Sequence, residues 1–232
     1  MYAVTKSIFT DIYSIYVEPR KVFTKSSSDF GAFWAPILLI PLLIFMANYA
    51  YFERVSPEYF VEEQLAQKQD ISQSEYNVAE SLLLDMHGSQ AYITSTVEVL
   101  TWILIGLFSA AYLFIVAKWF SGQQMTFRKS LVWTSWLLMP VCIAKIISII
   151  SIFHSSTGEI SYTLLSPLTL AQISQLYTSL NIGSTLGSLI SVFTVWESIL
   201  LAVFLNRLGL SGLLSFAFGM APITTLTLLA FI

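Results

Sequence analysis

Five long apolar runs, separated by polar segments, divide the chain. They cover residues 32–52, 99–120, 131–153, 186–206 and 213–232. Each run has about 20 mostly apolar residues, enough for an α-helix to cross the hydrocarbon core of a bilayer, and each is too long for a buried strand. Lipid offers the backbone no hydrogen bonds, so such runs must be helical. The pattern predicts an all-α, polytopic integral membrane protein whose single domain, 1–232, has five transmembrane helices.

Composition points to the same class of protein. Hydrophobic residues make up 56% of the 232 residues and charged residues 11%, whereas about a quarter of a typical soluble domain is charged. A soluble core of this length cannot absorb so much apolar surface, so the excess must face lipid. Residues 1–25 lack an apolar stretch with a small-residue cleavage site, so we expect no cleaved signal peptide.

Basic residues alternate between the two sides of the predicted helices. Segment 53–98 holds nine acids against Arg54 and Lys68, and segment 154–185 holds no Lys or Arg. The remaining segments and the end of the second run carry the other cations: Lys6, Arg20, Lys21, Lys25, Lys118, Arg128, Lys129 and Arg207. The positive-inside rule therefore predicts a cytoplasmic N-terminus and an extracytoplasmic C-terminus.

Residues 1–25 are predicted to form a short interfacial helix on the cytoplasmic face. Its apolar residues recur at helical spacing and would face lipid or the helix bundle: Val4, Ile8, Ile12 and Ile15. The Glu18-Pro19 step should end this helix, because a residue before proline avoids the helical region. Segment 154–185 is polar and nearly uncharged, and it fits either a second interfacial helix or a re-entrant piece.

The acidic segment 53–98 predicts an extracytoplasmic helical loop. Pro57 suits the first position of a helix, Ser72 and Glu75 fit a capping box, and Gly88 is a plausible helix end. The acids could hold a divalent cation. No compact carboxylate motif is present, however, so we favour a solvated acidic face and predict no metal site.

Two charged residues lie deep in the predicted helices, Lys145 in the third run and Glu197 in the fourth. At 1.5 Å per residue, Lys145 lies about 12 Å and Glu197 about 16 Å below the outer ends of their helices. An unpaired charge at such depth costs about 2.5–3.5 kcal/mol, and a flexible lysine stem can bridge the difference in depth. We therefore predict that the two residues form an ion pair, which either fixes helix packing, the reading we favour, or serves as a proton or ion site.

Neighbouring polar and small residues complete this candidate intramembrane site. Cys142 and Ser148 lie one turn either side of Lys145, and Thr194 lies on the fourth helix. Pro140 removes a helical hydrogen bond and predicts a kink. Close helix packing is predicted at small residues in helical register: Gly183, Gly187, Ser191, Gly106 and Gly219. Cys142 is the only cysteine, which excludes an intrachain disulfide.

The sequence contains no recognisable catalytic constellation. It has no HExxH motif, no GxSxG motif with a credible His and Asp, and no glycine-rich phosphate loop. No basic groove is available for nucleic acid. We therefore expect a protein without enzyme activity, cofactor or nucleic-acid partner.

Several stretches resemble the bacterial branch of the Yip (Ypt-interacting protein) membrane family. They are EPRKVF (18–23), FWAPILLIPLL (33–43), FSGQQMTFRKSLVWTSWLLMPV (120–141), and Trp196 followed by LNRLGLSGLLSFAFG (205–219). The resemblance covers nearly the whole chain. It implies five helices with a cytoplasmic N-terminus, in agreement with the charge pattern.

The resemblance also implies a function. Eukaryotic members are associated with Rab-type GTPases, vesicle traffic and membrane shaping, but this sequence lacks their long cytoplasmic N-terminal region and their acidic-Leu-Tyr-Gly-Pro motif, which makes GTPase binding doubtful. We expect a non-enzymatic protein of the bacterial inner membrane that organises the bilayer or recruits a partner, either a membrane protein or a second copy of the chain. The alternative is a small-ion or proton-coupled transporter or channel that uses Lys145 and Glu197.

Overall fold

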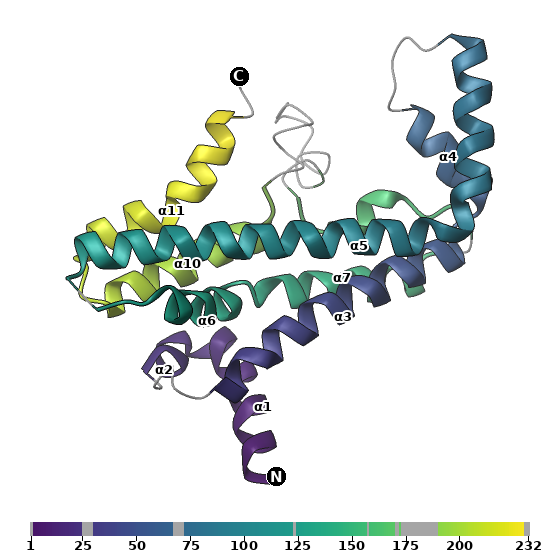
Figure 1. The fold of residues 1–232 in the computed structure, drawn as a ribbon. Coiled ribbons are helices and arrows are strands. Elements are labelled where there is room, and N and C mark those ends of the chain that lie inside the picture. The colour runs from purple at the N-terminus through teal and green to yellow at the C-terminus, as the bar shows by residue number, and fades with distance from the viewer. Residues whose placement is uncertain are drawn as a thin grey trace. The chain divides into compact units, whose positions relative to one another are not determined.

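The structure, a computed structural model, is built from helices (Figure 1). It describes residues 2–24, 30–66, 72–122, 124–156, 158–169, 172 and 190–229. Its named elements are α1 (Tyr2–Val17), α2 (Pro19–Thr24), α3 (Phe30–Arg54), α4 (Pro57–Ala66), α5 (Gln73–Phe120), α6 (Phe127–Leu137), α7 (Pro140–His154), the 3₁₀ helix η1 (Tyr162–Leu165), α10 (Val192–Arg207) and α11 (Gly212–Leu229). Pairing of extended backbone in these residues is limited to two isolated bridges. The all-α fold class is confirmed.

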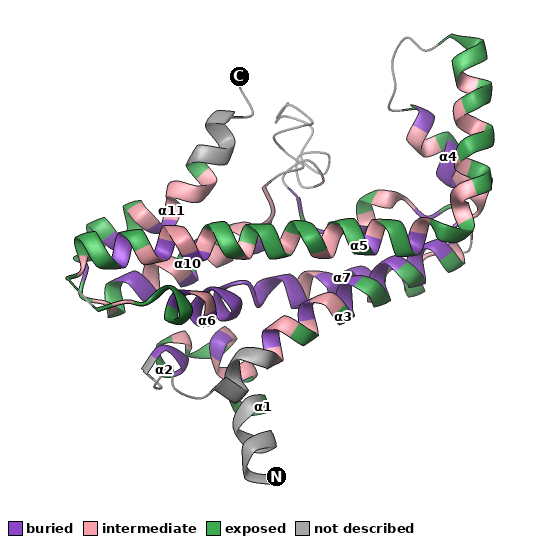
Figure 2. Ribbon diagram, in the orientation of Figure 1, coloured by how far each residue is buried: buried purple, intermediate pink, exposed green. Residues whose placement is uncertain are grey.

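Three helical stretches are long and apolar enough to cross a membrane: 35–54, 73–120 and 127–154. A shorter apolar helix covers Gly212–Thr224. Within the apolar window of α5 only 17% of the residues are buried, and Figure 2 shows most of this helix as exposed or half-buried. Large apolar side chains such as Phe108, which is 75% exposed, cover its surface. A helix that is apolar all round and so little buried by protein needs lipid around it.

The described chain divides into two compact units. The first consists of 1–40, 102–141 and 168–232, and the second of 41–101 and 142–167. Each unit is described by itself below.

An aromatic cluster forms the core of the first unit. Phe23 on α2 packs edge to face on Trp133 of α6 and on Phe204 of α10, with ring centroids 5.7 and 5.0 Å apart. Trp133 and Phe204 are themselves 5.3 Å apart. All three side chains are buried, so the cluster attaches the short α2 to two longer helices. The preceding helix α1 is anchored by Tyr16, whose hydroxyl donates to Met139 O at 2.6 Å.

Helices α10 and α11 form a close antiparallel pair in the same unit. A Cβ atom added to Gly219 would lie 2.6 Å from Ala202 Cβ and 2.9 Å from Ser198 O, so only glycine fits there. The turn that connects the helices contains Gly209 with φ of +98°, a conformation that glycine adopts without strain. The predicted close packing at Gly219 is confirmed.

The second unit is an outer cap in which α4 and the start of α5 pack on the ends of α3 and α7. Its apolar core includes Tyr51, Phe52, Phe60, Ile152 and Ile160. Ser56 N donates to Gly158 O at 2.9 Å, and Gly158 N donates to Arg54 O at 3.2 Å, which ties the end of α3 to the residues after α7. The predicted helix starts are confirmed: Pro57 opens α4, and Ser72 and Glu75 exchange capping hydrogen bonds before α5.

Three sequence predictions are corrected by these elements. Gly88 does not end a helix, because α5 continues through it to Phe120. Pro140 does not kink one long helix but opens a new one: α6 ends at Leu137, and the Trp136 carbonyl that proline leaves free accepts from Met139 N at 3.2 Å. The N-terminal helix is split at Glu18 into α1 and α2, as the proline predicted, but its exposed apolar row is Phe9, Tyr13 and Val17, and Ile15 is fully buried.

Candidate functional site: a buried ion pair

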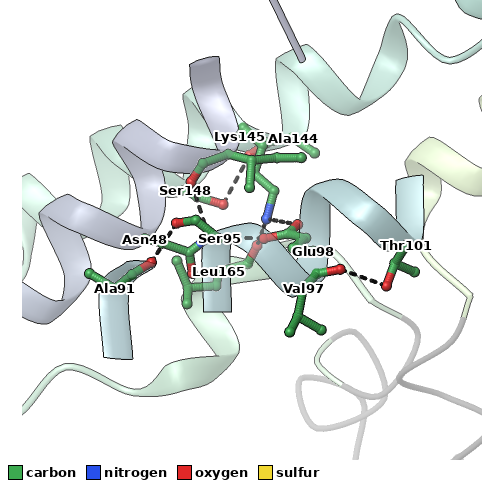
Figure 3. Close-up of polar contacts among 11 residues, drawn as sticks. Asn48, Ala91, Ser95, Val97, Glu98, Thr101, Ala144, Lys145, Ser148 and Leu165 are labelled. Atoms are coloured by element: carbon green, nitrogen blue, oxygen red, sulfur yellow. Dashed lines mark hydrogen bonds and ion pairs between the residues drawn. The ribbon is translucent and has the colours of Figure 1, made fainter. Parts of the chain in front are cut away.

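Lys145 is the centre of a polar cluster in the second unit (Figure 3). Its ammonium group lies 2.5 Å from Glu98 Oε1, and the side chains of Lys145 and Glu98 are 5% and 24% exposed. The same ammonium group donates to Leu165 O at 2.9 Å. Two of the three donors of the lysine are therefore engaged, one by a carboxylate and one by a backbone carbonyl.

Asn48 completes the cluster from α3. Its Nδ2 donates to Glu98 Oε2 at 3.0 Å and to Ile44 O, also at 3.0 Å, and the residue is fully buried. Each oxygen of Glu98 thus has its own partner, Lys145 for one and Asn48 for the other. Asn48 Oδ1 is buried without a hydrogen-bond partner among the described residues.

Two buried serines lie beside the pair and bond within their own helices. Ser95 Oγ donates to Ala91 O at 2.6 Å, and Ser148 Oγ donates to Ala144 O at 3.1 Å. Serine commonly satisfies its hydroxyl in this way inside a helix. Both hydroxyl protons are therefore used locally, and the ion pair depends on Asn48 and Leu165 for its remaining hydrogen bonds.

Helical register explains how these side chains meet. Cys142, Lys145 and Ser148 follow one another at three-residue spacing on α7, and all three are buried, so they share the inward face of that helix. On α5, Ala91, Ser95 and Glu98 share a face at spacings of four and three. The predicted position of Cys142 and Ser148 beside Lys145 is confirmed.

The predicted partner of Lys145 was wrong. The structure pairs Lys145 with Glu98, whereas Glu197 belongs to the other unit. The apolar run that starts at residue 99 made Glu98 appear to be the last residue of the acidic loop. Because α5 begins at Gln73 and continues without a break, Glu98 is instead a helical residue. The signal available in the sequence was an acid immediately before a long apolar run, within reach of a flexible lysine stem.

The fourth predicted span also starts later than the sequence indicated. Ser191 is the N-cap of α10, and its side chain and that of Thr194 form a reciprocal capping box. Ser191 and Thr194 therefore shape a helix end, and Glu197 lies in the second turn of α10 rather than at its middle. Gly183 and Gly187 lie outside the described residues. Gly106 packs loosely, since an added Cβ would meet only Leu138 Cδ1, at 3.6 Å.

A second set of polar contacts lies in the same unit. Glu63 on α4 accepts from Ser161 Oγ at 2.6 Å and from Tyr162 N at 2.8 Å, at the start of η1. Leu165, at the end of η1, supplies the carbonyl that Lys145 binds. The four-residue η1 is therefore held at both ends by charged side chains.

The chemistry of the cluster is that of a crosslink. An ion pair buried with its hydrogen bonds satisfied joins α3, α5, α7 and η1 by directional contacts, and removing one partner leaves a charge stranded. Among the described residues, no group of three His, Cys, Asp or Glu side chains is placed to hold a metal ion.

These features define a helical integral membrane protein whose outer helices are joined by a buried lysine–glutamate pair. Its family follows from sequence comparison: the model of the Yip1 domain matches residues 13–232, so the chain belongs to the Yip1 domain family. The predicted family resemblance is confirmed. No match is found among curated proteins or among solved structures.

Proposed function

We propose that this chain is a non-enzymatic organiser of the bacterial inner membrane, with a trafficking-like role in shaping the bilayer or recruiting a membrane protein. The observation that carries the proposal is membership of the Yip1 domain family over nearly the whole chain. The proposed topology has five spans, with the N-terminus in the cytoplasm and segment 53–98 outside.

Contacts within each unit support this topology. In the first unit, Arg20 and Arg207 line one pocket, and both come from segments that the positive-inside rule places in the cytoplasm. In the second unit, Glu63 binds Ser161 and Tyr162, and both of their segments are expected outside. Residues predicted to share a side are thus found in contact.

The ion-carrier alternative has lost the residues on which it was built. It required Lys145 to work with Glu197, but Lys145 is bound by Glu98 and Leu165. A site for a moving proton or ion needs a carboxylate with free acceptor capacity, whereas each oxygen of Glu98 is already engaged. We therefore propose a structural role for the cluster.

Two experiments on the full chain test the proposal. A photo-crosslinker at the exposed, cytoplasmic Lys129 should join the chain in native membranes to one discrete membrane protein or to a second copy of itself. The same group at Phe108, which faces lipid, should give lipid adducts only. In sealed liposomes the chain should carry no proton, sodium or potassium flux. Flux that depends on the chain, or identical crosslinks from both positions, would contradict the proposal.

A further inference from the structure

A small basic pocket lies between α2 and α10 in the first unit. Arg20, Val203, Asn206 and Arg207 line it, and its volume is about 160 Å³. The two arginines come from helices separated by more than 180 residues of sequence, and the aromatic contact of Phe23 with Phe204 holds those helices together. The pocket is therefore a product of the fold.

Both guanidinium groups are available to a ligand. Among the described residues, no hydrogen bond, ion pair or ring contact engages Arg20 or Arg207. Nearby Lys21 is paired with Glu18. Asn206 donates through Nδ2 to Leu210 O at 3.2 Å, and an amide nitrogen has two hydrogens, so one remains. The lining thus offers two charged forks and an amide donor.

The chemistry of this lining selects a phosphate. Guanidinium groups bind phosphate oxygens in a bidentate manner, with strong charge-assisted hydrogen bonds. The volume of about 160 Å³ is well below the roughly 300 Å³ at which pockets begin to enclose a drug-sized ligand. One phosphate group fits, and the rest of its molecule must lie outside the pocket.

The surroundings identify the source of that phosphate as a lipid. The pocket lies at the end of the apolar α10, immediately before α11, whose first turns expose Leu213 at 81% and Phe216 at 58%. Acyl chains can cover such a surface. Basic pockets between membrane helices on the cytoplasmic side are suited to anionic lipid headgroups. We propose that Arg20, Asn206 and Arg207 bind the headgroup phosphate of an anionic phospholipid. This inference goes beyond the proposed function and does not depend on partner recruitment.

The test compares lipids on the purified full-length chain by native mass spectrometry. Phosphatidylglycerol should be retained as one tight adduct, and phosphatidylcholine, whose phosphate is neutralised by choline, should bind at least about ten-fold more weakly. Arg20→Gln and Arg207→Gln should each weaken phosphatidylglycerol binding, and the double variant should lose about ten-fold or more, because each charge-assisted hydrogen bond contributes substantially. Arg128→Gln, which removes the same charge outside the pocket, should bind phosphatidylglycerol like the unmodified chain.

Two further arms keep the result decisive. Inorganic phosphate at millimolar concentration should not displace the lipid; displacement would assign the pocket to a soluble anion. If the double variant misfolds, the single variants and a salt titration of the unmodified chain decide the question, since binding through exposed arginines must weaken as salt rises. Equal phosphatidylglycerol binding by the unmodified chain and both single variants would overturn the proposal, as would loss of binding in Arg128→Gln.

Discussion

At the scale of the residue, Lys145 illustrates how a membrane protein accommodates an internal charge. The ammonium group is nearly inaccessible, and Glu98 and Leu165 receive two of its donors. Asn48 holds the second oxygen of the carboxylate. The arrangement follows the rule that charges within a membrane protein face the interior and find partners there.

Removing one member of this pair should cost more than removing both. Lys145→Met and Glu98→Gln should each lower the free energy of unfolding by about 3–5 kcal/mol, or less if the survivor reaches water, and the double variant should recover part of the loss. Thermal unfolding in detergent measures all three. The control is the cycle of Lys145→Met with Glu197→Gln, in which the losses should add. Additive losses in the Glu98 cycle would show that no such pair forms.

Glycines in helices provide a matched series of packing tests. Gly219→Ala should lower the free energy of unfolding by about 1–3 kcal/mol, because the new methyl group overlaps Ala202. Gly106→Ala should be neutral or stabilise by up to about 1 kcal/mol, since its Cβ has room and alanine favours the helix. Thermal unfolding distinguishes the two, and equal stability of both variants would contradict the close α10–α11 contact.

The sequence identified the residue under strain more readily than its partner. An ammonium group in an apolar run is visible without a structure, and Cys142 and Ser148 follow from helical register. Glu98 could not be assigned in that way, because a carboxylate at the edge of a run belongs equally well to the loop or to the helix. The difference lies in the helix boundary, which apolar content alone does not locate.

At the scale of the element, α2 shows what a short helix gains from packing. Six residues are too few for a stable isolated helix, so α2 depends on buried Val22 and Phe23. The sequence predicted a break at Glu18-Pro19 but placed the N-terminal segment on lipid. It could not reveal the docking of Phe23, because the aromatic partners Trp133 and Phe204 are far away in sequence.

Truncating this anchor should release the N-terminal helices. Phe23→Ala should increase hydrogen exchange of the backbone amides over 9–24, because a buried phenylalanine contributes about 3–5 kcal/mol to local packing. Phe9→Ala, at a side chain that is 68% exposed, is the control and should leave exchange unchanged. Exchange over 9–24 that is the same in the unmodified chain and in Phe23→Ala would show that the aromatic cluster does not hold α2.

At the scale of the whole molecule, the apolar pattern predicted the class of protein and most helix positions. Predicted span 131–153 is built from two helices, since Leu138 and Met139 turn the backbone before Pro140. The predicted fourth span was set too early, because the Ser191 and Thr194 cap is a backbone feature that hydropathy does not record. Hydropathy registers the environment of a segment, whereas helix ends depend on individual hydrogen bonds.

The proposed topology has a direct test by thiol labelling. In a Cys142→Ser background, Ser74→Cys and Lys129→Cys place single thiols at two exposed positions. An impermeant thiol reagent should label Ser74→Cys in intact cells, and Lys129→Cys only after the membrane is opened, since the two segments are predicted on opposite sides. The reverse pattern would invert the topology, and labelling of both positions in intact cells would remove it.

The ion pair also has a consequence for biosynthesis. In the proposed topology, α5 enters the membrane before α7 during translation, so Glu98 is already in place when Lys145 leaves the ribosome 47 residues later. A lysine near the centre of a nascent helix costs about 2.5–3.5 kcal/mol at the translocon, and the waiting carboxylate lowers that cost. Correct integration of the third apolar run thus depends on a helix made earlier, so a chain that loses Glu98 is expected to fail during insertion, before it is folded.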